Sequence, residues 1–215
     1  MSNPKKGKTR NAEVTQGIIL DSATEEFSRK GFDGARIDAI TKRAGVNVNL
    51  VYHYFSGKEG LFIATMERAY NKMRAHHNDL EIRGMEPVEA MAELVKSVFR
   101  LFCKDVDLIA LLNSENLHKA KHIRKSTEIK YLFNPLLDTI REILDRGVAE
   151  GKFRSGVDPV ELFISINAEG YFFLSNRHTL GFILHQDLLD PDRIVQRESH
   201  IVDVILSFLQ YQEKR

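Results

Sequence analysis

The chain has few of the residues that mark secreted or membrane-bound proteins. Its 215 residues include one cysteine, five prolines and no tryptophan. A lone cysteine cannot form a disulfide within the chain, which is typical of reducing compartments. No stretch approaches the ~20 apolar residues of a membrane span, and no apolar run follows the basic first residues as in a signal peptide. We therefore expect a cytoplasmic protein.

Signatures of enzymes are also missing. There is no glycine-rich phosphate loop, nucleophile elbow or metal motif of the usual strength, so neither catalysis nor a cofactor is expected. Glu115, His118 and His122 share one helical face at spacings i, i+3 and i+7, which permits metal coordination. However, the same segment is crowded with cations that oppose a divalent ion, so we favour a solvated helix end and predict no metal. These cations are Lys119, Lys121, Arg124 and Lys125.

Charge is unevenly distributed along the chain, although the net charge is only +1. Residues 1–58 hold 10 Lys/Arg against 6 Asp/Glu, whereas the remainder holds 21 against 24. A basic N-terminal part followed by a slightly acidic remainder is typical of a DNA-binding domain joined to a domain that does not contact DNA.

The stretch from Arg36 to Leu61 has the pattern of a helix, a tight turn and a second helix. Ile37 and Ile40 share one helical face, and Gly45 supplies a residue that can take positive φ and end that helix. Asn47 can cap the next helix by accepting from its unpaired first-turn N–H groups. A helix–glycine turn–helix of this size fits a helix into the major groove of DNA.

The same stretch, from about residue 14 to 62, resembles the DNA-binding domain of TetR/AcrR-type transcriptional regulators. It departs from the family pattern at Arg36, where Ser or Thr is usual, and at Asn49-Leu50, where Gly-Thr is common. The resemblance is carried by Gly31-Phe32, Ile37-Asp38-Ala39-Ile40, Ala44-Gly45-Val46, Val51-Tyr52-His53-Tyr54-Phe55 and Lys58-Glu59-Gly60-Leu61. It implies an all-α fold with an N-terminal three-helix helix-turn-helix domain and a C-terminal helical bundle for ligand binding and dimerisation.

The domain organisation follows from these patterns. We expect a flexible basic arm over residues 1–12, the DNA-binding domain over 13–60 and the effector-binding and dimerisation domain over 61–215. Apolar periodicity and turn signals predict body helices over 87–103, 107–121, 127–151 with a kink or break at 134–135, 158–178 and from 190 onward.

The helix from Asn47 to Tyr54 is expected to lie in the major groove. Asn47 and Asn49 can pair with base edges, although Asn47 can equally be a cap alone, and Val48 and Leu50 can press on thymine methyl groups. Phosphate contacts are expected from a further set of residues, of which Arg36 replaces the usual hydroxyl and the others match family positions. This set is Arg36, Tyr52, His53 and Lys58.

The last two predicted helices are apolar around most of their circumference. Such helices need burial on most sides, and a two-fold four-helix interface would supply it, in agreement with the dimer that the resemblance implies. A larger monomer core is the alternative. The expected interface residues are Phe163, Ile166, Gly170, Leu174, Ile201, Val204, Ile205 and Phe208.

The resemblance also implies a small-molecule effector in the body. Polar residues within apolar helices are the only indication of its site, because a buried polar group needs a partner and a ligand is one such partner. A neighbouring helix or the dimer mate is another. The candidates are Asn113, Glu115, Asn116, His118, Asn167, Glu169 and Tyr171.

Together the patterns and the resemblance imply a DNA-binding transcriptional regulator. The residues do not decide between a repressor and an activator, and the resemblance implies a repressor because repression is the common mode of the family. The protein would bind a near-palindromic operator as a homodimer and be released by an effector. The alternative is a helical adaptor of the same fold that acts through protein–protein contacts, against which the basic N-terminal part and the presence of Tyr52 and Lys58 argue.

Overall fold

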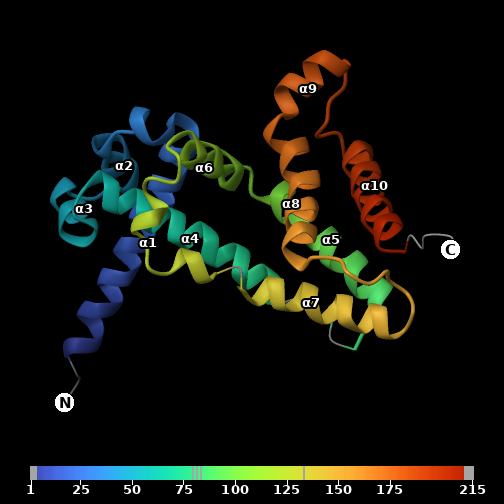
Figure 1. The fold of residues 1–215 in the computed structure, drawn as a ribbon. Helices are drawn as coiled ribbons and strands as arrows, with labels where there is room; N and C mark the ends of the chain where they lie inside the picture. Colours follow the sequence, from blue (N-terminus) through green and yellow to red (C-terminus); the bar gives the residue numbers. More distant parts are fainter. Residues whose placement is uncertain (1–3, 79, 81, 83, 133, 211–215) are drawn as a thin grey trace. The chain divides into compact units, whose positions relative to one another are not determined.

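The computed structural model describes residues 4–78, 80, 82, 84–132 and 134–210, and every regular element among them is a helix (Figure 1). The predicted all-α fold class is thus confirmed. The elements are α1 (Pro4–Gly34), α2 (Ile37–Ala44), α3 (Val48–Phe55), α4 (Lys58–Asn78), α5 (Pro87–Lys104), α6 (Val106–Leu117), the 3₁₀ turns η1 (Ile123–Lys125) and η2 (Ile129–Tyr131), α7 (Asn134–Ala149), α8 (Pro159–Ser175), α9 (Arg177–Leu184) and α10 (Pro191–Gln210).

The chain forms two compact units, and the N-terminal one is discontinuous in sequence. Unit 1 combines Met1–Tyr70 with Ala110–Lys130, and unit 2 combines Asn71–Ile109 with Tyr131–Arg215. From the sequence, residues 110–130 are expected in the C-terminal domain, whereas in the structure they pack in the same unit as residues 1–70. Helices α4 and α6 each contribute residues to both units.

In unit 1 the helices α1, α2 and α3 pack in succession. Helix α1 is interrupted at Gly31, whose φ of 65° is not helical. The helix begins at Pro4, so most of the arm expected over residues 1–12 is helical, and residues 1–3 lie outside the described part. The core consists of fully buried apolar side chains from α1 to α4: Ile19, Ala23, Phe27, Ile40, Val51, Leu61, Phe62 and Met66.

The turn between α2 and α3 has the predicted construction. Gly45 ends α2 with φ 65° and donates its N–H to the last turn of that helix. Asn47 then caps α3, because its side-chain oxygen accepts the Asn49 N–H at 2.9 Å. Both predictions are confirmed, and Gly45 and Asn47 together fix where α3 starts.

The corner between α3 and α4 depends on a second glycine. Ser56 ends α3 in the left-handed region, and α4 begins two residues later at Lys58. A Cβ on Gly60 would lie only 1.9 Å from the Phe55 carbonyl oxygen. The first turn of α4 therefore approaches the end of α3 more closely than any side chain allows.

In unit 2, helix α5 packs against α7, α8 and α10. Gly170 permits close approach of α8, because a Cβ there would lie 3.3 Å from the rings of Phe99 and Phe102. The buried side chains of this unit include Met91, Leu94, Phe99, Ile140, Ile143, Leu162, Ile166, Leu174, Ile201, Ile205 and Leu209.

Helix boundaries differ from the predicted ones at three places. Helix α6 ends at Leu117 rather than near Lys121, since Lys119 and Ala120 have left-handed φ values of 56° and 59°. The stretch predicted over 127–151 is α-helical only from Asn134, where the predicted break lies, and a 3₁₀ turn precedes it. The helix predicted to reach residue 178 divides into α8 and α9. Within the described residues, no helix is both long and apolar enough to cross a membrane.

Candidate nucleic-acid interface

Helix α3 has one buried side and one exposed side. Val51 is completely buried against the unit 1 core. Asn49, Tyr52 and His53 are exposed, and Tyr52 keeps 57% of its surface accessible although it is a large aromatic residue. Val48 is also exposed, and Leu50 is half-buried. The exposed side thus combines an amide, a phenol, an imidazole and an apolar group, which is the mixture that contacts bases and phosphates in a major groove.

Two expected phosphate contacts flank this helix. Arg36 is exposed at the start of α2 and lies 3.7 Å from Asp38, an exposed pair that holds it weakly. Lys58 opens α4, where its ammonium nitrogen donates to the Asp33 carbonyl oxygen at 3.1 Å and lies 4.9 Å from the centre of the Phe32 ring. Since an ammonium group has three donors, one internal bond leaves others for a phosphate.

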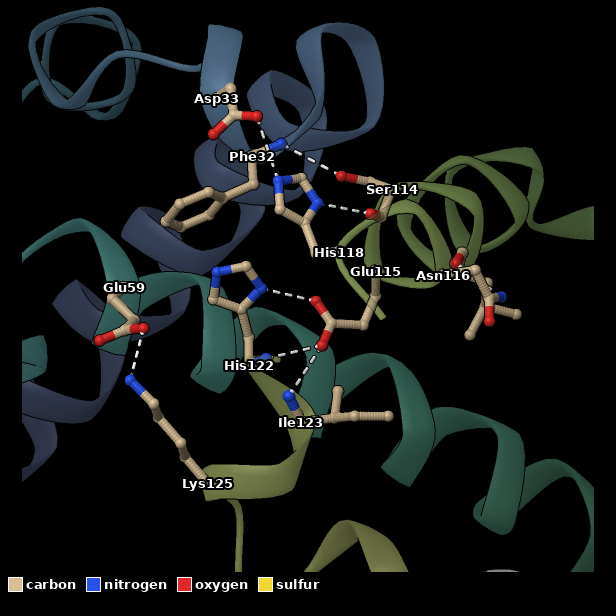
Figure 2. A network of polar contacts seen from close by, with 11 residues as sticks. Phe32, Asp33, Glu59, Ser114, Glu115, Asn116, His118, His122, Ile123 and Lys125 are labelled. Atoms are coloured by element: carbon tan, nitrogen blue, oxygen red, sulfur yellow. Dashed lines mark hydrogen bonds and ion pairs between the residues drawn. The ribbon is translucent and has the colours of Figure 1, made fainter. Parts of the chain in front are cut away.

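A polar network joins the end of α1 to the chain after α6 (Figure 2). Ser114 is buried, and its hydroxyl oxygen accepts the Phe32 N–H at 3.1 Å. The ring of His118 donates through Nδ1 to the Ser114 carbonyl oxygen at 2.7 Å and through Nε2 to the Asp33 carboxylate at 3.1 Å. Both ring nitrogens therefore face acceptors, an arrangement that only the doubly protonated ring satisfies.

Glu115 and His122 form a buried pair within the same network, as Figure 2 shows. One carboxylate oxygen of Glu115 accepts the backbone N–H groups of His122 and Ile123 at 2.8 and 3.0 Å, and the other accepts from His122 Nδ1 at 2.7 Å. His122 Nε2 has no partner among the described residues. The ring lies 4.1 Å from that of Phe32 and 5.0 Å from that of Phe62, so it completes the aromatic core of unit 1.

Two further contacts fix the residues that follow. Lys125 donates to the Glu59 carboxylate at 2.6 Å, and this hydrogen bond lowers the pKa of Glu59. Ser126 donates to the Glu67 carboxylate at 2.6 Å. The segment after α6 is thus bonded to α4 at two places. None of these pairings is visible in the sequence, where the only signal is a cluster of cations within an otherwise acidic body.

These contacts change the interpretation of the predicted effector residues. For Glu115 and His118 the sequence leaves open a ligand, a neighbouring helix or the dimer mate as partner, and in the structure groups within unit 1 accept or donate their hydrogen bonds. Asn116 is exposed and donates to the Leu112 carbonyl oxygen. Asn113 is half-buried in the same unit.

The other three effector candidates belong to α8 in unit 2. Glu169 pairs with Arg197 of α10, so its carboxylate is also occupied within the protein. Asn167 donates to the Phe163 carbonyl oxygen at 2.8 Å, and the Tyr171 ring lies 5.9 Å from that of Phe102. The seven candidates therefore do not form a single site within one unit.

The expected dimer residues differ in how much of their surface the protomer leaves exposed. Ile166, Gly170 and Leu174 point toward the protomer's own core, since Leu174 is fully buried and Gly170 faces α5. Ile201 and Ile205 are likewise buried, so these five have almost no surface for a partner. Phe163 is half-buried, and only Val204 and Phe208 are exposed. Sequence periodicity identifies a buried face without showing whether the burial is internal or between subunits.

Comparison with protein families gives two matches that cover most of the chain. A model of the bacterial regulatory proteins of the tetR family matches residues 19–65, and a model of the tetracyclin repressor-like C-terminal domain matches residues 87–205. The first match contains α2, α3 and the Gly45 turn, and the second begins at the first residue of α5.

Individual proteins that are similar to this chain are also transcriptional regulators. The chain is 32% identical over 199 residues to the HTH-type transcriptional repressor NicS of Pseudomonas putida, covering 93% of this chain and 94% of NicS. It is 28% identical over 169 residues to the regulatory protein RaaS of Mycobacterium tuberculosis, covering 77% and 73%.

Solved structures share the fold. The ketosteroid regulator KstR2 of Mycobacterium tuberculosis has a TM-score of 0.66 at 16% identity, with 92% of this chain and 95% of KstR2 covered. The regulator FadR of Bacillus subtilis, solved in complex with stearoyl-CoA, has a TM-score of 0.63 at 19% identity, with 89% and 98% covered.

Proposed function

Because the chain belongs to the tetR family of bacterial regulatory proteins, whose members regulate transcription by binding DNA, we propose that it is a repressor that binds its operator as a homodimer and is released by a small organic effector. The exposed side of α3, opposite the completely buried Val51, is the observation that carries this proposal. Such a regulator works in the cytoplasm, where it has access to DNA.

Within α3, Asn49 is the proposed base contact, because an amide can pair with both the donor and the acceptor of adenine. Asn47 uses its side-chain oxygen for the Asn49 N–H, so its role as a cap is the better supported of its two alternatives. Val48 and Leu50 would lie against thymine methyl groups. Arg36, Tyr52, His53 and Lys58 would bind phosphates and set the register of α3 on the duplex.

A homodimer is supported by an apolar stripe that α8 leaves exposed. Val160, Ile164 and Phe172 keep 47–57% of their surface accessible and recur at multiples of four residues, so they lie along one side of the helix. Val204 and Phe208 on α10, which packs beside α8, are also exposed. We place the two-fold interface on these side chains, and the operator then has two half-sites.

Effector binding is assigned to unit 2. FadR, one of the similar structures, was solved with stearoyl-CoA, and KstR2 is named a ketosteroid transcriptional regulator, so an effector with a large apolar part is proposed. Asn167 and Tyr171 are half-buried on α8 and are the proposed polar contacts of such a ligand. Glu115, His118 and Glu169 are left out because their side chains are held in ion pairs within the protein.

The direct test is a gel shift with DNA that flanks the protein's own gene, at two salt concentrations. Asn49→Ala should alter the preference among operator variants, by about 1–3 kcal/mol at one base pair. Lys58→Ala should weaken binding to all duplexes and flatten the salt dependence by about one unit. If both variants bound DNA as the wild type does, the proposed placement of α3 in the groove would be wrong.

A further inference from the structure

Four cations occupy the chain just after α6. Residues 118–126, which we call the basic turn, contain Lys119, Lys121, Arg124 and Lys125 and no carboxylate. Lys119, Lys121 and Arg124 are exposed, and none of the three forms a side-chain hydrogen bond or ion pair with the described residues. A patch of unpaired cations raises the local positive potential and attracts a polyanion.

Residues 110–130, which include the basic turn, contribute half of the net positive charge of unit 1, the unit that contains α3. Unit 1 holds 16 Lys/Arg against 10 Asp/Glu, a net charge of +6, whereas unit 2 holds 15 against 20. The stretch from Ala110 to Lys130 supplies five of these cations against two carboxylates. The excess of positive charge is thus confined to unit 1, and the basic turn is a large part of it.

The basic turn is held rigidly. Glu115 accepts the backbone N–H groups of His122 and Ile123, so the chain is bonded to a buried carboxylate in the middle of the turn. Lys119 and Ala120 both have left-handed φ values, which cost non-glycine residues about 1–2 kcal/mol each. Such strain persists only where the surrounding contacts fix the backbone, and it concentrates at functional sites.

The turn lies beside an expected phosphate contact. Lys125 is bonded to Glu59, which directly follows Lys58 in the first turn of α4 (Figure 2). The charge of Lys121 is close enough to lower the pKa of Glu59 further. The basic turn therefore adjoins the start of α4, which itself adjoins the end of α3.

We propose that the basic turn is a second DNA-binding surface, in which Lys119, Lys121 and Arg124 contact the phosphates that flank the base pairs faced by α3. This rests on the proposed DNA-binding function and adds to it a contact outside the helix-turn-helix domain. The cations are long and flexible and reach phosphates rather than base edges, so they would strengthen binding without changing its sequence preference.

The test compares two triple variants of the full chain with equal change in net charge. Lys119→Gln/Lys121→Gln/Arg124→Gln neutralises the basic turn and keeps most of each side-chain stem. Lys72→Gln/Lys104→Gln/Lys152→Gln removes three exposed cations of unit 2 as the control. Binding to a fluorescent duplex of random sequence is measured by anisotropy at several salt concentrations, and a duplex from the flank of the protein's own gene is measured in parallel.

The basic-turn variant should bind both duplexes at least about tenfold more weakly at low salt, and its salt slope should fall by about one unit for each phosphate that the turn no longer binds. Its thermal stability and its preference for the flanking duplex should match those of the wild type. A slope and affinity equal to those of the control variant would overturn the proposal, as would a weakening confined to one duplex, since phosphates are common to both.

Failure of the proposed function would be recognised separately. In that case the wild-type protein itself would bind neither duplex at low salt, before any variant is compared. Binding of an acidic protein by the basic turn, the alternative for a cationic surface, would leave the DNA affinity of the triple variant unchanged and so also overturn the proposal.

Discussion

At the scale of single residues, Glu115 is a buried carboxylate that holds the turn after α6. Its side chain is almost entirely buried, yet it accepts three hydrogen bonds from the residues that follow α6. A buried carboxylate is tolerated only when donors surround it, and here two of the donors are backbone groups. The geometry of the turn is therefore tied to the charge of one side chain.

Replacing Glu115 with Gln should destabilise unit 1 by about 1–3 kcal/mol, because the amide NH₂ would face the His122 ring donor or leave a backbone N–H unpaired. Glu128→Gln is the matched control, since Glu128 is exposed and only a few residues away. Thermal unfolding followed by circular dichroism measures both. A Tm for Glu115→Gln equal to that of the control would show that the charge of Glu115 is not needed.

His118 predicts a dependence of stability on pH. Its hydrogen bond to the Ser114 carbonyl raises the pKa of His118 above the ordinary 6.5, and Asp33 raises it further. A pKa that is raised by folding stabilises the folded state. The stabilisation is complete at pH values below the pKa of the unfolded state, and it disappears as the pH rises through the pKa of the folded state. The decrease of Tm in His118→Gln should therefore be greater at about pH 6 than at about pH 9.

The control for His118 is His200→Gln, an exposed histidine of α10. Its Tm should follow that of the wild type at both pH values. The opposite trend for His118→Gln, with a greater decrease at high pH, would mean that the ring is not held as the doubly protonated form.

At the scale of elements, the corner between α3 and α4 is set by backbone contact. The first turn of α4 lies so close to the Phe55 carbonyl that Gly60 cannot carry a side chain without displacement. Because α3 is only eight residues long, its orientation depends on this corner and on the Asn47 cap at its other end.

Gly60→Ala should therefore destabilise the protein by about 1–3 kcal/mol and weaken DNA binding beyond the effect on stability, because α4 must move relative to α3. Gly17→Ala is the contrasting variant: a Cβ there meets no atom within 4 Å, and alanine in a helix interior is favoured by about 0.5–1 kcal/mol. Tm and anisotropy on one duplex test both. A Gly60→Ala protein as stable as Gly17→Ala would contradict the close approach of the two helices.

Local signals explain which elements the sequence predicts. Gly45, Asn47 and Pro191 each act on the residues next to them, and the sequence predicts the corresponding boundaries of α2, α3 and α10. It does not predict the turn after α6, because Lys119 and Ala120 have no preference for left-handed backbone. A helix continued through that turn places Glu115 and His122 on one face, in an arrangement that permits a metal site. In the structure the chain reverses there, and the same two residues form a buried pair.

Predictions about the site also succeed where the signal is local and fail where it depends on residues far away in the sequence. The exposure of Asn49, Tyr52 and His53 follows from helical periodicity around Val51, so the sequence predicts it. The partners of Glu115, Glu169 and Leu174 lie outside their own helical turns, so the sequence does not distinguish a neighbouring helix of the same chain from an effector or a dimer partner. Burial can be predicted from a pattern of residues, but the identity of the covering element cannot.

At the scale of the whole molecule, the exposed stripe of α8 predicts the oligomeric state. Ile164→Glu should dissociate the proposed dimer, because the introduced carboxylate would be buried in its interface. Val195→Glu is the control, since Val195 is more exposed than Ile164 and lies on α10 outside the stripe. Sedimentation velocity distinguishes the two. A dimer that survives Ile164→Glu would place the two-fold axis elsewhere.

The discontinuity of unit 1 has a consequence for building hybrid regulators. A graft of residues 1–70 onto another body would separate Phe32, Asp33, Glu59 and Glu67 from the side chains that bond them, all of which come from residues 114–126. A functional exchange of operator specificity between relatives should therefore transplant both stretches together. A chimaera joined at a single crossover would carry α3 on a domain with part of its interior removed.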